Sequence, residues 1–138
     1  MLEKAIQCAV KAHAGQKDKA GAPYILHPLR IMMKMDNQAG MIAAVLHDVV
    51  EDSSVTLADL RAEGFSEEVI AAVDHLTRRE GEAYEIFINR LRHNPLAVKV
   101  KLADLEDNMD IRRIENVTER DIERLQKYQT AREKLSAP

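Results

Sequence analysis

Cysteine is nearly absent from this chain: Cys8 is the only one in 138 residues. A single cysteine excludes an intrachain disulfide framework and favours a reducing compartment. The sequence also has no run of about 18 apolar residues, which a transmembrane helix would need. Near the N-terminus, the charges of Glu3, Lys4 and Lys11 interrupt the apolar pattern that a secretory signal requires. These absences predict a cytoplasmic protein.

An excess of positive charge is also missing, because 20 Lys and Arg residues stand against 23 Asp and Glu residues. The net charge of −3 gives no reason to expect a nucleic acid polymer or an anionic membrane as a partner. With 46% hydrophobic and 31% charged residues, the composition is typical of one globular domain, which we expect to span residues 1–138. The sequence leaves open whether the chain forms a homodimer.

Nearly every periodic stretch has helical spacing, and no alternating strand pattern, internal repeat or low-complexity linker is found. The sequence therefore predicts an all-α, compact multi-helix domain. Residues 14–26, with Gly15, Gly21 and Pro23, are expected to form a loop. The predicted helices cover residues 2–13, Pro28 to about Met35, 38–51, Thr56 to Gly64, a segment capped by Ser66, 82–93, 96–109, and Thr118 to about Leu135.

The predicted helix 38–51 carries an unusual set of ionisable residues near its C-terminal end. His47 and Asp48 lie inside an apolar run, where two adjacent titratable groups are costly unless something compensates them. Glu51 and Asp52 follow one turn later, where helical spacing places them beside the same patch of surface. Their negative charge opposes the helix macrodipole, which suggests a functional role, although they could simply be solvated.

Two further segments supply matching groups. Asp104 lies on the polar face of the predicted helix 96–109, and His27 stands at the entrance of the helix that begins at Pro28. Two imidazoles and two carboxylates are enough to hold one divalent metal ion, which could activate water for hydrolysis. Mixed nitrogen and oxygen ligands suit Mn²⁺, Fe²⁺ or Zn²⁺, and the absence of a thiolate favours Mn²⁺. The dipeptide His47-Asp48 alone would favour a buried core histidine beside a hydrogen-bonding aspartate over a pair of metal ligands.

Four blocks of the sequence resemble, in order, the hydrolase domain of the RelA/SpoT family, a branch of the HD-domain phosphohydrolases. The resemblance covers about residues 1–112. The blocks are His13-Ala14-Gly15-Gln16, Pro23-Tyr24-Ile25-Leu26-His27-Pro28-Leu29, Ala43-Ala44-Val45-Leu46-His47-Asp48-Val49-Val50-Glu51-Asp52, and Val100-Lys101-Leu102-Ala103-Asp104. The short length and the lack of a synthetase domain make the chain similar to a stand-alone small alarmone hydrolase.

The resemblance implies a reaction and assigns roles to residues. The reaction would be removal of the 3′-diphosphate of ppGpp as pyrophosphate. His27, His47, Asp48 and Asp104 would bind Mn²⁺. Glu51 and Asp52 would handle the attacking water and its proton, and Asn108 would contact the sugar-phosphate of the nucleotide.

Two positions depart from the family's usual pattern. An Arg-Lys pair is expected in the loop after residue 16, where the arginine packs on guanine, but Asp18 stands near the arginine position. Asp110 replaces a second expected arginine. We expect the substrate to be a small phosphorylated nucleotide oriented by Lys17, Lys19, Lys101 and Asn108, which flank the proposed ligands in sequence.

Other functions fit parts of this pattern. The substrate could instead be a nucleoside monophosphate or the 2′-phosphate of NADPH. A non-catalytic nucleotide-binding module would be expected to lose at least one of the metal or water-handling residues. A helical interaction protein would hold no metal ion tightly.

Overall fold

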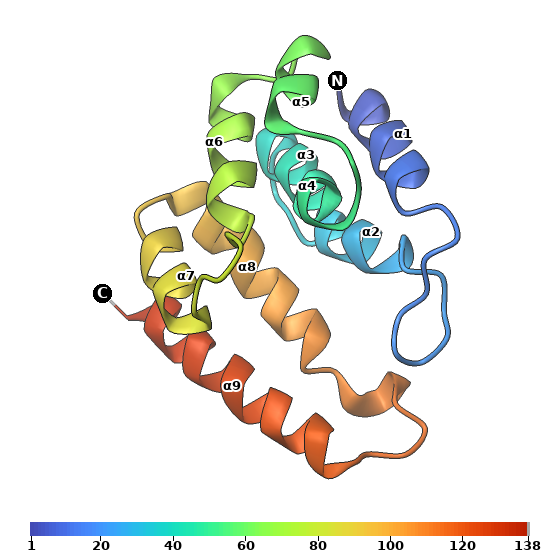
Figure 1. The fold of residues 1–138 in the computed structure, drawn as a ribbon, viewed down its shortest axis with the longest axis vertical. Coiled ribbons are helices and arrows are strands. Elements are labelled where there is room, and N and C mark those ends of the chain that lie inside the picture. The colour runs from blue at the N-terminus through green and yellow to red at the C-terminus, as the bar shows by residue number, and fades with distance from the viewer. Residues whose placement is uncertain (138) are drawn as a thin grey trace.

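The computed structural model describes residues 1–137, which form a set of packed helices (Figure 1). Within these residues no strand forms, and a single antiparallel bridge joins Lys17 to Pro23. The all-α prediction is confirmed. In chain order the elements are α1 (Leu2–Ala12), α2 (Leu26–Met33), α3 (Gln38–Leu46), α4 (Val49–Asp52), α5 (Leu57–Ala62), α6 (Glu67–Leu76), α7 (Tyr84–Leu91), α8 (Pro95–Asn108), the 3₁₀ turn η1 (Ile111–Arg113) and α9 (Glu119–Ser136).

Helix α3 forms the centre of the hydrophobic core. It packs against α1, α2, α6 and α8, and residues 43–46 have no solvent-exposed surface. Burial of this apolar run provides much of the driving force that holds the surrounding helices together. Since His47 and Asp48 follow this run directly, their backbone is fixed by the best-packed part of the molecule.

Helices α8 and α9 lie side by side, and α9 also contacts α7 (Figure 1). Helix α9 is mostly polar, yet Ala131 and Leu135 are buried. The C-terminal helix is therefore packed against the rest of the fold.

The prediction of one continuous helix over residues 38–51 is wrong, because a turn at His47 and Asp48 separates α3 from α4. In a continuous helix, the Ala44 carbonyl would accept the N–H of Asp48. Here the backbone N–H of His47 reaches that carbonyl at 3.4 Å, and His47 Nδ1 lies 2.6 Å from it. The imidazole thus competes with the backbone for this acceptor and interrupts the helix at the two residues of interest.

The predicted start of α2 at Pro28 is also wrong, because the helix begins at Leu26. The N–H groups of Leu26 and His27 donate to the carbonyls of Pro23 and Tyr24, so the preceding loop leads directly into the helix. His27 therefore occupies the first turn. Pro28 is still within that turn, where its missing N–H costs nothing.

The predicted cap at Ser66 is confirmed, because its side chain accepts the N–H of Val69. The predicted helix starts at Thr56 and Thr118 are also confirmed, since each forms a reciprocal capping box, with Asp59 and Asp121 respectively. No helix within residues 1–137 is both long enough and apolar enough to cross a membrane.

Candidate metal centre

Four side chains from three segments converge in the interior. His27 comes from α2, His47 and Asp48 from the turn between α3 and α4, and Asp104 from α8. His27 Nε2 lies 2.8 Å from Asp104 Oδ1, and His47 Nε2 lies 3.5 Å from the same oxygen. Asp48 Oδ2 lies 3.0 Å from His47 Nε2 and 4.0 Å from His27 Nε2. The structure thus brings together the four residues that the sequence predicted as metal ligands.

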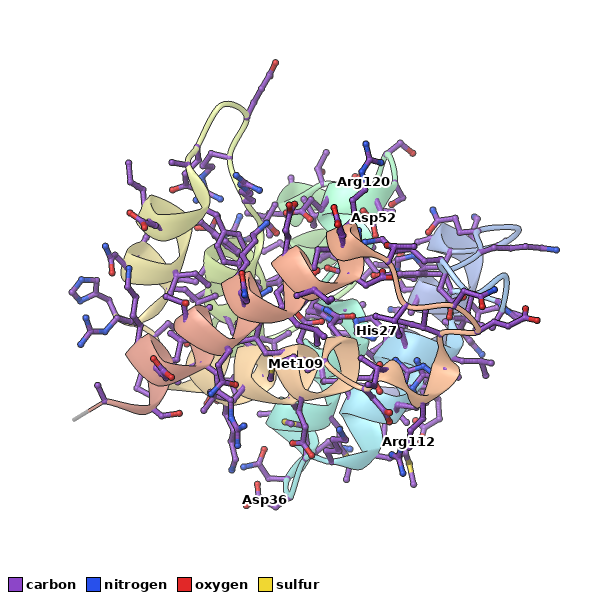
Figure 2. All side chains as sticks on the ribbon, turned by 90° about the horizontal axis from the view of Figure 1, so that it is seen from below. His27, Asp36, Asp52, Met109, Arg112 and Arg120 are labelled. Carbon is purple, nitrogen blue, oxygen red and sulfur yellow. The ribbon has the colours of Figure 1, made fainter. Side chains whose placement is uncertain are left out.

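Three of these residues, His27, His47 and Asp104, offer ligand atoms that all lie within 4.8 Å of one another. All three are buried. In Figure 2 the His27 side chain lies in the interior, whereas Asp36 and Arg112 lie at the periphery. Asp48 is at the edge of this group, where its carboxylate also accepts the hydroxyl proton of Tyr24. Two imidazole nitrogens and two carboxylates are a suitable donor set for a divalent ion.

His47 gives the clearest indication that this group fits a metal. Its Nδ1 donates a hydrogen bond to the Ala44 carbonyl, so Nε2 points toward Asp48 and Asp104. Within residues 1–137, this buried Nε2 has no hydrogen-bond partner of acceptable geometry. Buried polar atoms without partners are rare and call for an explanation. A cation placed among the four donors would provide it.

The charges in the site also favour a cation. Burial by itself would lower the pKa of His47, but the Asp48 and Asp104 carboxylates raise it well above its ordinary value. Burial would raise the pKa of Asp48, yet the nearby positive charge of His47 lowers it to about 2. The two carboxylates therefore create a negative potential in the space between them, and a divalent cation bound there would neutralise it.

Asp107 supports His27 from behind. Its Oδ2 lies 2.6 Å from His27 Nδ1, which leaves Nε2 directed at Asp104 and Asp48. Arg30 in turn donates to Asp107 through Nε at 2.8 Å and through its terminal nitrogen at 3.0 Å. A carboxylate behind a ligating histidine fixes the ring orientation and raises the basicity of the ligand. Asp107 follows Asp104 by three residues on α8 and lies beyond the matching blocks of sequence, so the sequence gave it no role.

Lys101 and Asn108 both contact Asp104. Lys101 Nζ lies 2.8 Å from Asp104 Oδ2, and Asn108 Nδ2 donates to Oδ1 at 3.1 Å. Burial would lower the pKa of Lys101, but the Asp104 charge outweighs that effect and raises it. The protonated lysine partly neutralises Asp104 on the side away from the imidazoles.

Glu51 and Asp52 lie on α4, one turn beyond His47 and Asp48. Glu51 lines the same cavity as His47 and Asp48, and its Oε1 accepts the backbone N–H of Arg78 at 2.7 Å. Partial burial raises the pKa of Glu51. Burial and the charges of Asp48 and Glu51 raise the pKa of Asp52 to about 6. Both groups are thus better proton acceptors than ordinary carboxylates, and neither is among the converging ligand atoms.

Two cavities meet beside this cluster. The smaller one, of about 140 Å³, is lined by His47, Asp48, Glu51 and Lys101 among others. The larger one, of about 380 Å³, is formed between the 17–20 loop and α9. Asn108 and Tyr128 line both cavities, so the two are adjacent.

The predicted substrate-binding residues divide between these cavities. Lys17 and Lys19 line the larger one, Lys101 lines the smaller one, and Asn108 lines both. Sequence reasoning missed Arg113 and Arg124, which also line the larger cavity. The sequence gave little indication that these two arginines bind substrate, because they lie outside the matching blocks of sequence.

Asp18 has a local structural role. Its Oδ1 accepts the backbone N–H groups of Ala20 and Ala22, each at 2.9 Å, and closes the tight loop in which Gly21 adopts a φ of +87°. Asn and Asp often stabilise turns in this way. The acid at the expected arginine position is therefore a turn-forming residue, although it also lines the larger cavity.

Comparison with known proteins connects this geometry to a family. The family described as HD domain matches residues 5–93. A guanosine-3′,5′-bis(diphosphate) 3′-pyrophosphohydrolase of Aquifex aeolicus is 33% identical over 121 residues, which cover 78% of this chain and 17% of that protein. A GTP pyrophosphokinase of Streptomyces coelicolor is 37% identical over 122 residues, covering 78% and 14%. The Escherichia coli bifunctional (p)ppGpp synthase/hydrolase SpoT is 32% identical over 123 residues, covering 78% and 17%.

The chain spans about one sixth of the length of these curated relatives. A solved structure, described as a metazoan ortholog of SpoT that hydrolyses ppGpp, has a TM-score of 0.81 to this chain. The likeness covers 99% of this chain and 85% of that chain at 22% sequence identity. At this identity, the likeness shows that the two proteins share a fold.

Proposed function

The chain belongs to the HD-domain family, and from this we propose that it is a metal-dependent phosphohydrolase that removes the 3′-diphosphate of ppGpp as pyrophosphate. The observation that carries the proposal is the convergence of His27, His47, Asp48 and Asp104 around the unpartnered Nε2 of His47. The names of the relatives direct the choice of substrate, since several are 3′-pyrophosphohydrolases of guanosine-3′,5′-bis(diphosphate).

We propose that His27, His47, Asp48 and Asp104 hold one Mn²⁺ ion, and that Fe²⁺ or Zn²⁺ can take its place. The mixed nitrogen and oxygen donors support this choice. When bound, such an ion supplies a Lewis acid at the phosphate and lowers the pKa of water. Asp107 would keep His27 in the ligating orientation.

In the overall reaction, one water is consumed. A P–O bond forms from the water oxygen, and the bond between phosphorus and the 3′ oxygen breaks. A proton returns to that oxygen, which leaves GDP and pyrophosphate. Glu51 and Asp52 are the proposed proton handlers, because both have raised pKa values and lie one turn from the ligands. Their contribution as general acid–base groups would be about 10²–10⁴-fold in rate.

The nucleotide would lie across the two cavities. Lys17 and Lys19 would bind the part in the larger cavity, Asn108 would contact the sugar-phosphate at the boundary, and Lys101 would face the smaller cavity. Since α9 supplies Tyr128 to both cavities, we propose that one functional HD-type phosphohydrolase domain spans residues 1–138.

A less highly charged nucleotide is the second candidate substrate. The carboxylates of Asp18 and Asp110 line the larger cavity, where the family resemblance leads us to expect cations. Two acids there would weaken binding of a polyphosphate more than binding of a nucleoside monophosphate or NADPH.

A release assay distinguishes these substrates. The Mn²⁺-loaded protein is incubated with ppGpp, pppGpp, nucleoside monophosphates and NADPH, while phosphate and pyrophosphate are measured separately. We expect pyrophosphate from ppGpp and no comparable release from Asp104→Ala. Phosphate released faster from a nucleoside monophosphate or NADPH would favour the second candidate, and no release from any of them would contradict the proposal.

A further inference from the structure

The smaller cavity contains a cluster of cations around one aromatic ring. Lys127 Nζ lies 4.0 Å from the centre of the Tyr84 ring. The guanidinium carbon of Arg78 lies 5.6 Å from this centre, and Lys101 Nζ lies 5.9 Å from it. Attraction to the ring stabilises each cation, but one neutral ring cannot remove the repulsion between them.

Within residues 1–137, no carboxylate forms an ion pair with Arg78 or Lys127. Among residues 1–137, Lys101 is paired with Asp104, while Arg78 directs its Nε to the Glu82 carbonyl. Burial lowers the pKa of Lys127, and the charges of Arg78 and Lys101 lower it further, with no carboxylate acting against them. Arg78 and Lys127 thus face the cavity without a carboxylate partner of their own.

The Tyr84 hydroxyl is the second irregular feature. It is buried, and within residues 1–137 it has no hydrogen-bond partner. A buried polar atom that lacks a partner is destabilising, because it has lost its hydrogen bonds to water. A hydroxyl group can donate to an anion, and the adjacent cations can neutralise that anion.

We propose that Arg78, Lys127 and Tyr84 form an anion subsite that binds the terminal phosphate of the diphosphate group and then the released product. This placement in the reaction rests on the proposed function. His47, Asp48 and Glu51 line the same cavity, so an anion bound there lies beside the candidate metal centre. Lys127 comes from α9, outside residues 5–93 that match the family, so the C-terminal helix would supply part of the site.

Inorganic phosphate is a direct probe of this subsite. Its affinity for the Mn²⁺-loaded protein is measured by isothermal titration calorimetry. Lys127→Gln removes the charge, and we expect roughly tenfold weaker binding, as for loss of one charge-assisted hydrogen bond. Lys134→Gln is the matched control, because Lys134 lies on the same helix but does not line the smaller cavity. We expect its phosphate affinity to stay within about twofold of the wild type.

Tyr84→Phe tests the hydroxyl separately. Removing an unpartnered buried hydroxyl should leave the melting temperature unchanged or raise it, while phosphate binding weakens several-fold. If Tyr84 only packed in the core, its substitution would not combine an unchanged or higher melting temperature with weaker phosphate binding. Unchanged phosphate affinity in either Lys127→Gln or Tyr84→Phe would overturn the proposal. Equal losses in Lys127→Gln and Lys134→Gln would also overturn it, because they would indicate only a long-range charge effect.

The phosphate titration does not depend on turnover. If phosphate binding depends on Lys127 but no ppGpp is hydrolysed, the anion subsite stands and the proposed function fails. If ppGpp is hydrolysed but phosphate binding is independent of Lys127, the proposed function stands and the anion subsite fails.

Discussion

His27 Nδ1 lies 2.6 Å from Asp107 Oδ2, and this contact sets the direction of the whole imidazole. Asp107 is 4% exposed and is itself held by Arg30. Because one ring nitrogen is occupied by this carboxylate, the other is directed at Asp104 and Asp48. The orientation of a proposed ligand therefore depends on a residue outside the proposed ligand set.

We expect Asp107→Asn to weaken Mn²⁺ binding by about 10–100-fold, the usual effect of losing a carboxylate behind a ligating histidine. Metal titration followed by elemental analysis of the dialysed protein measures this change. Asp36→Asn is the control, since Asp36 forms an exposed ion pair with Lys99 at the molecular surface. Equal metal content in the two variants and the wild type would remove Asp107 from the site.

We expect Asp104→Ala to abolish both Mn²⁺ binding and hydrolysis. It should also destabilise the fold, because it leaves the largely buried Lys101 without its partner, which typically costs about 3–5 kcal/mol. The double variant Asp104→Ala with Lys101→Met should regain much of that stability in urea denaturation but no metal. Full metal content in Asp104→Ala would show that the ligand assignment is wrong.

Glu51→Gln should reduce kcat by about 10²–10⁴-fold while the fold and Mn²⁺ content are preserved. The amide oxygen of glutamine can still accept the N–H of Arg78, so the local structure should survive. Parallel loss of metal and activity would make Glu51 a ligand. An unchanged rate would make it a solvated residue at the end of α4.

The sequence singled out the four groups that converge in the structure, because each is an ionisable residue inside an apolar pattern, and their role as metal ligands stays a prediction. It did not predict the break between α3 and α4, since that break depends on which carbonyl the His47 ring contacts. Helical spacing also could not show that Lys127 of α9 would lie over the ring of Tyr84. Contacts between distant segments are set by packing, and one sequence contains no direct record of them.

The ion pair between Glu82 and Arg90 predicts a pH dependence of stability. The hydrogen bond that Glu82 accepts from Arg90 lowers the pKa of the Glu82 carboxyl from 4.5 to about 2. A depressed folded-state pKa stabilises the protein above about pH 4.5, and this stabilisation is lost as the pH falls toward 2. We expect Glu82→Gln to melt below the wild type at pH 6, with a smaller difference at pH 3. A constant Glu82→Gln difference across this range would contradict the prediction.

Asp18 offers a test of how the larger cavity selects its nucleotide. An arginine at this position would break the turn, because Asp18 Oδ1 accepts the N–H groups of Ala20 and Ala22. Asp18→Asn keeps that oxygen and removes only the negative charge. We expect a several-fold lower KM for ppGpp in this variant, with little change in kcat, because a polyanion no longer faces a carboxylate.

Ala20→Arg is the complementary variant, since Ala20 lines the same cavity and is exposed. It adds a guanidinium that can stack on a base while the Asp18 turn stays intact. If the missing cation limits ppGpp turnover, both variants should lower KM for ppGpp. The ratio of kcat/KM for ppGpp to that for NADPH should then rise. If neither variant changes this ratio, the charge of the 17–20 loop does not select the substrate, and Asp18 serves the loop structure alone.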